Sequence, residues 1–125
     1  MTVRAPLVLV VDDYQDAREM YAEYLKQSGF RVEEARTGIE AVAKAQAVKP
    51  DCILMDLSLP GIDGWEATRQ LKADPNTRDI PVVAITGHAS ELASRDAASS
   101  GWASFVLKPA LPDAVVAEVR KAIDA

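Results

Sequence analysis

The sequence predicts an α/β fold in which a doubly wound, five-stranded parallel sheet carries helices on both faces. Five short apolar runs alternate with segments of helical periodicity along the chain, an alternation typical of a parallel sheet. Most of the runs are apolar at every position, as expected of strands covered on both faces. The 125 residues are enough for one hydrophobic core, so we expect a single domain over residues 1–125.

The first half of the chain contains the predicted strands 7–11, 30–35 and 52–55. The second of these carries charged residues, so we expect it to be the most exposed. Apolar residues at helical spacing predict two intervening helices, the first ended by Gly29 and the second by Pro50. Their predicted buried stripes are Ala17, Met20, Tyr21, Tyr24 and Leu25 in the first helix, and Ile39, Val42, Ala43 and Ala47 in the second.

The second half contains the predicted strands 82–85 and 105–107 and the predicted helices 65–73, 91–100 and 112–123. The helix at 91–100 is rich in Ala and Ser and has few large apolar anchors, so we expect it to be the least firmly packed. Pro112 suits the first position of the last helix. The apolar stripe of that helix is Val115, Val116, Val119 and Ile123.

Composition and charge exclude several classes of protein. The formal net charge of −5 argues against a protein that mainly grips nucleic acid. The longest aliphatic run, Leu7 to Val11, is far shorter than the ~20 residues of a membrane-spanning helix. No apolar signal segment is visible at residues 1–6, and the lone Cys52, expected to be an inert buried thiol, permits no disulfide within the chain. These observations predict a cytoplasmic protein.

Reactive side chains follow four of the five predicted strands where each strand ends. Asp12 and Asp13 follow the first strand, Asp56 the third, Thr86 the fourth and Lys108 the fifth. Ligands of open α/β sheets bind at the carboxyl ends of the strands, so we expect these groups to converge there. The second strand offers nothing comparable, as expected of an edge strand.

Three carboxylates in one pocket need positive charge among them. At ~4 Å and an effective dielectric constant of ~20, each like-charge pair costs about 4 kcal/mol before screening. Lys108 supplies one positive charge. A hard divalent cation suits oxygen ligands, which makes Mg²⁺ the natural candidate for the other. A carboxylate beside a metal ion and an ammonium group is equipped to act as the nucleophile in phosphoryl transfer.

The residues at these strand ends resemble the receiver domain of two-component response regulators. The motifs are Val11-Asp12-Asp13, the Asp-x-x-x-Pro-x-x-x-Gly segment from Asp56 to Gly64, Ile85-Thr86-Gly87 and Leu107-Lys108-Pro109. Each motif alone is weak, but four in this order in a chain of this length are specific, and they span essentially the whole sequence. The resemblance implies a flavodoxin-like, CheY-like sheet with strand order 2-1-3-4-5.

The resemblance also implies a metal site and a phosphoacceptor. Asp56 would accept the phosphoryl group. The side chains of Asp13 and Asp56 and the backbone carbonyl of Ser58 would ligate Mg²⁺, and Asp12 would contribute partly through water. Lys108 would pair first with Asp56 and then with the phosphoryl group.

Further positions take switching and tuning roles by the same resemblance. Thr86 would hydrogen-bond a phosphoryl oxygen, and Phe105 would be the aromatic side chain that moves inward with it. The Lys108–Pro109 peptide bond would be cis. Ser58 and His88 would flank the path of the attacking water and so tune the lifetime of the phosphoryl group.

The implied partners are a phosphate donor and an output protein. The donor would be a phosphohistidine on a sensor histidine kinase or a histidine phosphotransfer protein. The output protein would bind the face formed by residues 91–100, 105–107 and the last helix. The chain would be a regulatory phosphoacceptor rather than an enzyme, and would catalyse only its own phosphorylation and autodephosphorylation. Ala110, Trp102 and His88 depart from the commonest family pattern, and they bear on partner choice and phosphoryl lifetime.

Each residue also has a purely structural interpretation. Asp12 and Asp13 can cap the first helix or its preceding turn. Phe105 alone is expected to be a core aromatic, and His88 an exposed loop residue. Singly, Asp56, Thr86 and Lys108 would be ordinary residues at strand ends. We expect Tyr21, Tyr24 and Trp65 to lie in or near the core, and the Lys and Arg residues to line solvated faces.

Three other functions remain open at this stage. A Mg²⁺-dependent phosphatase with an Asp nucleophile normally needs a second acid two residues later, where this chain has Ser58, and a substrate cap. A nucleotide or flavin binder normally has a Gly-rich phosphate loop after the first strand, which this chain lacks. A receiver domain that binds a partner without being phosphorylated would not need the acids, the threonine and the lysine together.

Overall fold

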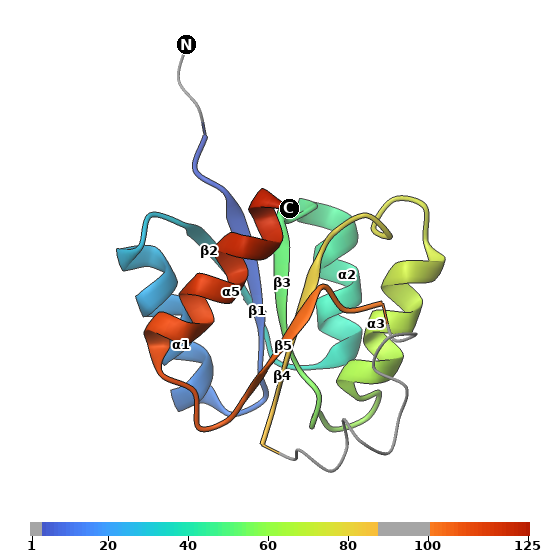
Figure 1. Ribbon diagram of the computed structural model, residues 1–125. Coiled ribbons are helices and arrows are strands. Elements are labelled where there is room, and N and C mark those ends of the chain that lie inside the picture. The colour runs from blue at the N-terminus through green and yellow to red at the C-terminus, as the bar shows by residue number, and fades with distance from the viewer. Residues whose placement is uncertain (1–3, 88–100) are drawn as a thin grey trace.

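The computed structural model describes residues 4–87 and 101–125. The described strands form one parallel sheet in the order β2-β1-β3-β4-β5, which confirms the predicted topology. The strands are β1 (Leu7–Val11), β2 (Arg31–Ala35), β3 (Cys52–Asp56), β4 (Val82–Thr86) and β5 (Ser104–Leu107). Their carboxyl ends lie together at the bottom of Figure 1. The predicted helix 91–100 and His88 lie outside the described residues.

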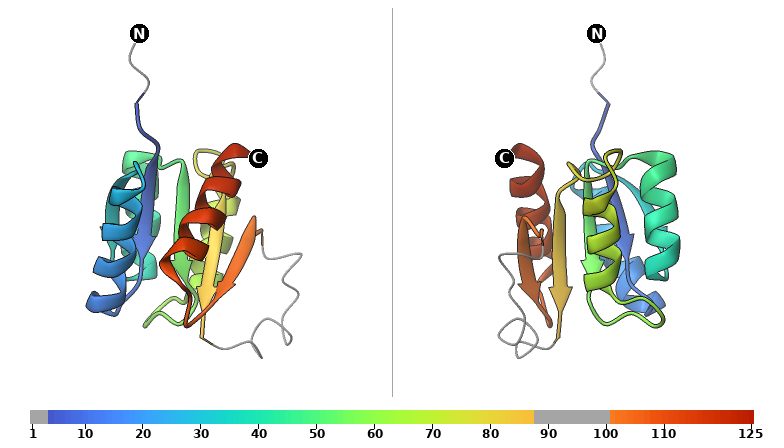
Figure 2. Two further views of the ribbon diagram at one scale, coloured as in Figure 1. Left: turned by 60° about the vertical axis from the view of Figure 1, so that its left-hand side comes forward. Right: turned by 90° about the vertical axis from the view of Figure 1, so that its right-hand side faces the viewer.

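Four described helices cover the sheet on its two faces. They are α1 (Gln15–Gln27), α2 (Gly38–Val48), α3 (Gly64–Ala73) and α5 (Pro112–Asp124). Figures 1 and 2 show α1 and α5 on one face and α2 and α3 on the other. Two apolar clusters fill the spaces between helices and sheet, one centred on Leu25, Leu54 and Val119, the other on Ile53, Met55 and Leu71.

Burial along the strands follows their position in the sheet. Every residue of β1, β3 and β4 is buried, as expected for central strands covered on both faces. The edge strands alternate or are partly exposed, and β2, with its charged residues, has only Ala35 fully buried. Consequently the side chains at the carboxyl ends of β1, β3 and β4 are attached to backbone that is buried and closely packed.

Two of the predicted apolar stripes are displaced around their helices. In α1, Met20 and Tyr24 are 39% and 41% exposed, whereas Arg18 and Ala22 are buried with Tyr21 and Leu25. In α2 the buried side chains are Ala41 and Ala45, and the larger Ile39 is 67% exposed. The small alanine side chains allow α2 to lie close to the sheet. In this helix the size of the side chains, rather than their hydrophobicity, therefore determines which residues face the sheet.

Among residues 4–87 and 101–125, no helix is long and apolar enough to cross a membrane. Cys52 is fully buried in β3, as predicted, and burial raises the pKa of its thiol to about 12.

Candidate functional site

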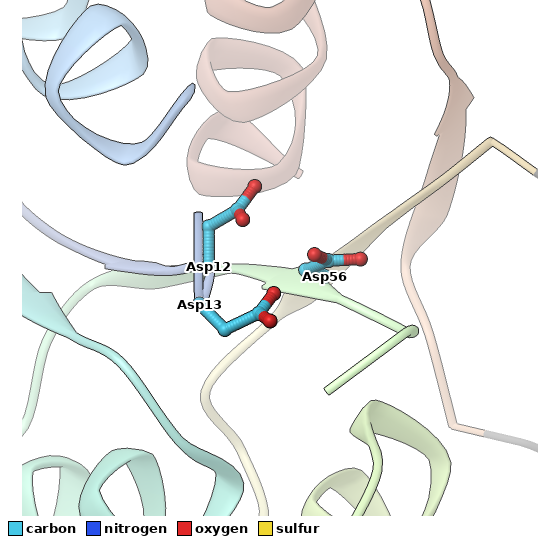
Figure 3. A group of neighbouring side chains, drawn as sticks. All are labelled: Asp12, Asp13 and Asp56. Atoms are coloured by element: carbon cyan, nitrogen blue, oxygen red, sulfur yellow. The ribbon is translucent and has the colours of Figure 1, made fainter. Parts of the chain in front are cut away.

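Three carboxylates meet at the carboxyl ends of two neighbouring strands. Asp12 and Asp13 directly follow β1, and Asp56 is the last residue of β3. These strands are hydrogen-bonded neighbours, with Val11 opposite Met55, so the acids that follow must lie side by side. Carboxylate oxygens from all three lie within 4.8 Å of one another, as Figure 3 illustrates. The structure therefore brings together the acids that the sequence predicted to converge.

Asp12 is held by hydrogen bonds from both its backbone and its side chain. Its backbone N–H donates to the carbonyl of Ala35 at 3.2 Å. Its Oδ1 accepts from the Tyr14 N–H at 2.9 Å, and its Oδ2 lies 3.1 Å from Lys108 Nζ. The residue is 1% exposed, whereas Asp13 is exposed. Asp12 thus caps the turn before α1, as its structural interpretation proposed, and also faces the pocket.

Asp56 is buried beside the same lysine. Its Oδ1 accepts the Ser58 N–H at 3.0 Å, and its Oδ2 lies 3.5 Å from Lys108 Nζ. The pKa of Asp56 is raised, chiefly because burial disfavours the charged carboxylate, with Asp12 adding repulsion. The Ser58 N–H and the lysine oppose this shift without reversing it. A further positive charge nearby would therefore favour the charged form of Asp56.

Lys108 carries the balancing positive charge. Burial alone would lower the pKa of its ammonium group, but the attraction of Asp56 and Asp12 outweighs burial and raises that pKa. Its backbone N–H donates to the Thr86 carbonyl at 2.7 Å, which fixes the end of β5 against β4. The Lys108–Pro109 peptide bond is cis, as predicted. The ammonium group stays charged between two acids.

The loop after β3 is pressed against the site by a glycine. Gly64, the first residue of α3, packs so closely that a Cβ atom there would lie 2.3 Å from the Asp56 carbonyl oxygen. Its N–H donates to the Leu57 carbonyl at 3.2 Å. The side chain of Asp63 caps α3 by accepting the Glu66 N–H at 2.9 Å. The Pro and Gly of the sequence motif thus belong to a turn that returns the chain directly beneath Asp56.

Comparisons with known proteins agree with this geometry. A family model described as the response regulator receiver domain matches residues 8–120. The chain belongs to this family. The polar-differentiation response regulator DivK of Brucella anthropi is 33% identical over 102 residues, which are 82% of this chain and 83% of DivK. Receiver domains of this family are the phosphoacceptor modules of two-component signalling.

Solved structures show the same architecture. A receiver domain of a Pseudomonas aeruginosa sensor histidine kinase, which has a magnesium ion coordinated in its active site cleft, superposes with a TM-score of 0.89 at 29% identity. The alignment covers 97% of this chain and 99% of that one. Chemotaxis protein CheY4 of Vibrio cholerae gives a TM-score of 0.87 at 27% identity, over 94% of this chain and 98% of that chain.

The predicted switch residues of the receiver domain, Thr86 and Phe105, lie on the neighbouring strands β4 and β5. Thr86 ends β4 and is fully buried, one residue beyond the Asp56–Ile85 pair. Phe105 is 47% exposed, so its interpretation as a core aromatic was wrong. The reason is that β5 is an edge strand: Val106 faces the core at 8% exposure, and its neighbours point to the other face.

Arg18 also contacts the site, although none of the sequence motifs includes it. The expectation that Lys and Arg residues line solvated faces fails here, because the Arg18 side chain is only 10% exposed. It donates to the backbone carbonyl of Asp12 and to the carboxylate of Glu34. A signal was present: residues 18, 21, 22 and 25 share one helical face, and Arg18 is the charged member of that face.

Two lysines also differ from the expectation that Lys and Arg residues line solvated faces. Lys44 Nζ donates to the Glu34 carbonyl oxygen, and Lys72 Nζ donates to the carbonyl oxygens of Arg78 and Ile80 at 2.9 and 2.7 Å. Both lysines hold loop or strand carbonyls rather than extending into solvent. The predicted aromatic core is right for Tyr21, which is 4% exposed, and wrong for Tyr24.

Proposed function

We propose that this receiver domain accepts a phosphoryl group on Asp56, with Mg²⁺ bound by Asp13, Asp56 and the backbone carbonyl of Ser58. The observation that carries the proposal is the convergence of three carboxylates within 4.8 Å, faced by one partly buried ammonium group. The charges of these four groups sum to −2, so the pocket attracts a divalent cation. The receiver family, and the rest of the site, favour this function over a phosphatase or a nucleotide binder.

The donor set fits Mg²⁺. All the groups are hard oxygen ligands, which this ion prefers. Asp13 is exposed and accessible to a hydrated ion. Both oxygens of Asp12 already accept from Tyr14 and Lys108, which supports its predicted contribution partly through water. When bound, the ion would neutralise the oxygens of the transferred phosphoryl group.

The protein's own groups carry the rest of the reaction. A carboxylate oxygen of Asp56 forms a bond to phosphorus as the P–N bond of a phosphohistidine breaks, and the imidazole leaves with the electron pair of that bond. Lys108, already 3.5 Å from Asp56, then pairs with the new phosphoryl oxygens. The hydroxyl of Thr86 donates a hydrogen bond to one of them.

The proposal extends to partners and location. The donor would be a sensor histidine kinase or a histidine phosphotransfer protein. The output protein would bind a surface that includes β5 and α5, where Phe105 and Leu107 are 47% and 43% exposed. The domain would catalyse only its own phosphorylation and dephosphorylation, with Ser58 and His88 tuning the latter. A cytoplasmic location remains a prediction from the sequence.

A small-molecule phosphodonor tests the assignment. We expect acetyl phosphate with Mg²⁺ to label the wild type, mass spectrometry of the trapped acyl phosphate to place the label on Asp56, and EDTA to abolish labelling. Asp56→Asn should remain unlabelled, whereas Asp79→Asn, which removes an exposed aspartate, should label normally. Equal labelling of Asp56→Asn would reject the site. No labelling of any variant would support a receiver that works without phosphorylation.

A further inference from the structure

Arg18 is buried beneath the acid pocket and donates in two directions. Its Nη1 lies 3.0 Å from the backbone carbonyl oxygen of Asp12, and its Nε lies 3.0 Å from Oε1 of Glu34 on β2. The side chain is 10% exposed, and that of Glu34 is 37% exposed. A planar guanidinium group suits this task, because it presents several donors in a fixed fork, and a lysine ammonium does not.

The carbonyl that Arg18 holds is central to the pocket. It belongs to the peptide group that joins Asp12 to Asp13, so its orientation determines how the two carboxylates project from the end of β1. Glu34 is itself fixed, since its backbone carbonyl accepts from Lys44 of α2. The contact chain therefore runs from α2 through β2 and α1 to the two acids.

The positive charge of Arg18 cannot by itself favour the binding of a cation. A buried positive charge beside a cation site weakens metal binding, and only a gain in geometry offsets this effect. We propose that Arg18 is a positioning residue for Mg²⁺, which fixes the Asp12–Asp13 peptide so that both carboxylates face the ion. This inference rests on the metal site proposed above.

Three interpretations of Arg18 make different predictions for Mg²⁺ affinity. If the guanidinium positions the acids, its loss weakens Mg²⁺ binding, by about tenfold or more as is typical for groups that orient metal ligands. If only its charge acts, its loss tightens binding, since the pocket becomes more negative. If it serves packing alone, its loss lowers the free energy of unfolding and leaves Mg²⁺ affinity unchanged.

The test is a Mg²⁺ titration followed by the backbone amide resonances of the ¹⁵N-labelled protein. The variants are Arg18→Met, which removes the charge and both contacts, and Arg18→Lys, which keeps the charge but cannot reproduce the fork. The matched control is Lys26→Met, which removes an exposed positive charge from the last turn of the same helix. Urea unfolding in EDTA measures stability separately from metal affinity.

We expect the Mg²⁺ dissociation constant to rise about tenfold in Arg18→Met, to rise by a smaller factor in Arg18→Lys, and to match the wild type in Lys26→Met. Tighter or unchanged binding in Arg18→Met overturns the inference. If Arg18→Met does not fold, the Mg²⁺ dissociation constant of Arg18→Lys is the test, and a value equal to that of the wild type overturns the inference. A wild type that shows no Mg²⁺-dependent shifts would reject the metal site itself, and the inference with it.

Discussion

The Cα atom of Gly64 lies directly against the main chain of Asp56. A Cβ atom at this position would lie 2.3 Å from the Asp56 carbonyl oxygen and 2.8 Å from the Cα of Leu57. These are main-chain atoms of a fully buried strand and of the residue after it, so neither can move aside without disturbing the sheet. The glycine that ends the Asp-x-x-x-Pro-x-x-x-Gly motif is thus required by how α3 packs beneath the proposed phosphoacceptor.

Gly64→Ala should destabilise the protein although alanine is the better helix former. Helix propensity alone would stabilise the variant by up to about 1 kcal/mol, whereas overpacking costs about 1–3 kcal/mol and here involves backbone. We expect a lower free energy of unfolding in urea and slower labelling by acetyl phosphate, because Asp56 is displaced. Gly87→Ala is the control for stability, since the one described neighbour within 4 Å of a Cβ atom there is Lys108 Cβ, at 3.9 Å. A Gly64→Ala protein as stable as the wild type contradicts the packing argument.

The sequence predicted the sheet and the acid cluster for one physical reason. In a parallel sheet, residues that follow neighbouring strands must be neighbours in space, so placing Asp12 and Asp56 at strand ends was enough to bring them together. The strand order itself came from family resemblance. The apolar runs alone do not distinguish one order of parallel strands from another.

The features that the sequence did not reveal depend on tertiary contacts. Arg18 is buried because two acceptors, on Asp12 and Glu34, lie within reach of it in the folded protein. Ile39 is exposed because the small side chain of Ala41 faces the sheet instead. Hydrophobic periodicity shows which face of a helix carries the apolar residues. It does not show how closely that helix approaches the sheet.

The two acids after β1 should differ in their effect on stability. Asp12→Ala removes the acceptor of the Tyr14 N–H and one of the two partners of Lys108, so the free energy of unfolding in EDTA should fall by about 1–3 kcal/mol. Asp13→Ala changes an exposed side chain and should stay within about 0.5 kcal/mol of the wild type. Its Mg²⁺ affinity should nevertheless fall strongly, as measured by amide shifts. A clearly destabilised Asp13→Ala protein would contradict this account of the pocket.

Asp56→Asn should raise the stability of the metal-free protein at neutral pH. Burial raises the pKa of Asp56, so between its ordinary value and that raised pKa the native state binds more protons than the unfolded chain. The wild type therefore loses stability as pH rises through this window, and the variant does not. We expect the difference in free energy of unfolding to vanish below about pH 3.9, the ordinary carboxyl pKa, and to be full above the raised pKa.

The control for this pH profile is Asp79→Asn, which removes an exposed carboxylate and should show no such pH-dependent gain. Mg²⁺ provides a second check, because the proposed site should bind it more tightly in the wild type than in Asp56→Asn. At ten times its dissociation constant, Mg²⁺ adds about 1.4 kcal/mol to the wild type and should narrow the gap. If metal-free Asp56→Asn is less stable than the wild type at pH 7, the buried carboxylate of Asp56 does not destabilise the native state.

Thr86→Ala should separate phosphorylation from the conformational response. A phosphoryl group shifts a two-state equilibrium only through contacts that differ between the states, and a hydrogen bond to a charged group is worth about 1.5–3 kcal/mol. Loss of that bond should reduce the active population about ten- to a hundredfold while Asp56 still accepts the phosphoryl group. Thr86→Ser keeps the hydroxyl and should respond like the wild type.

Fluorophenylalanine labelling can follow this response, because the chain has only two phenylalanines. Phe30 is buried in the core beside Arg120, on the face covered by α1 and α5, and serves as an internal reference. Phe105, which is half exposed, is the reporter. With beryllofluoride and Mg²⁺, we expect the ¹⁹F signal of Phe105 to shift in the wild type and in Thr86→Ser but not in Thr86→Ala. An equal shift in Thr86→Ala would mean that Phe105 moves without the threonine, and that the two residues do not form one switch.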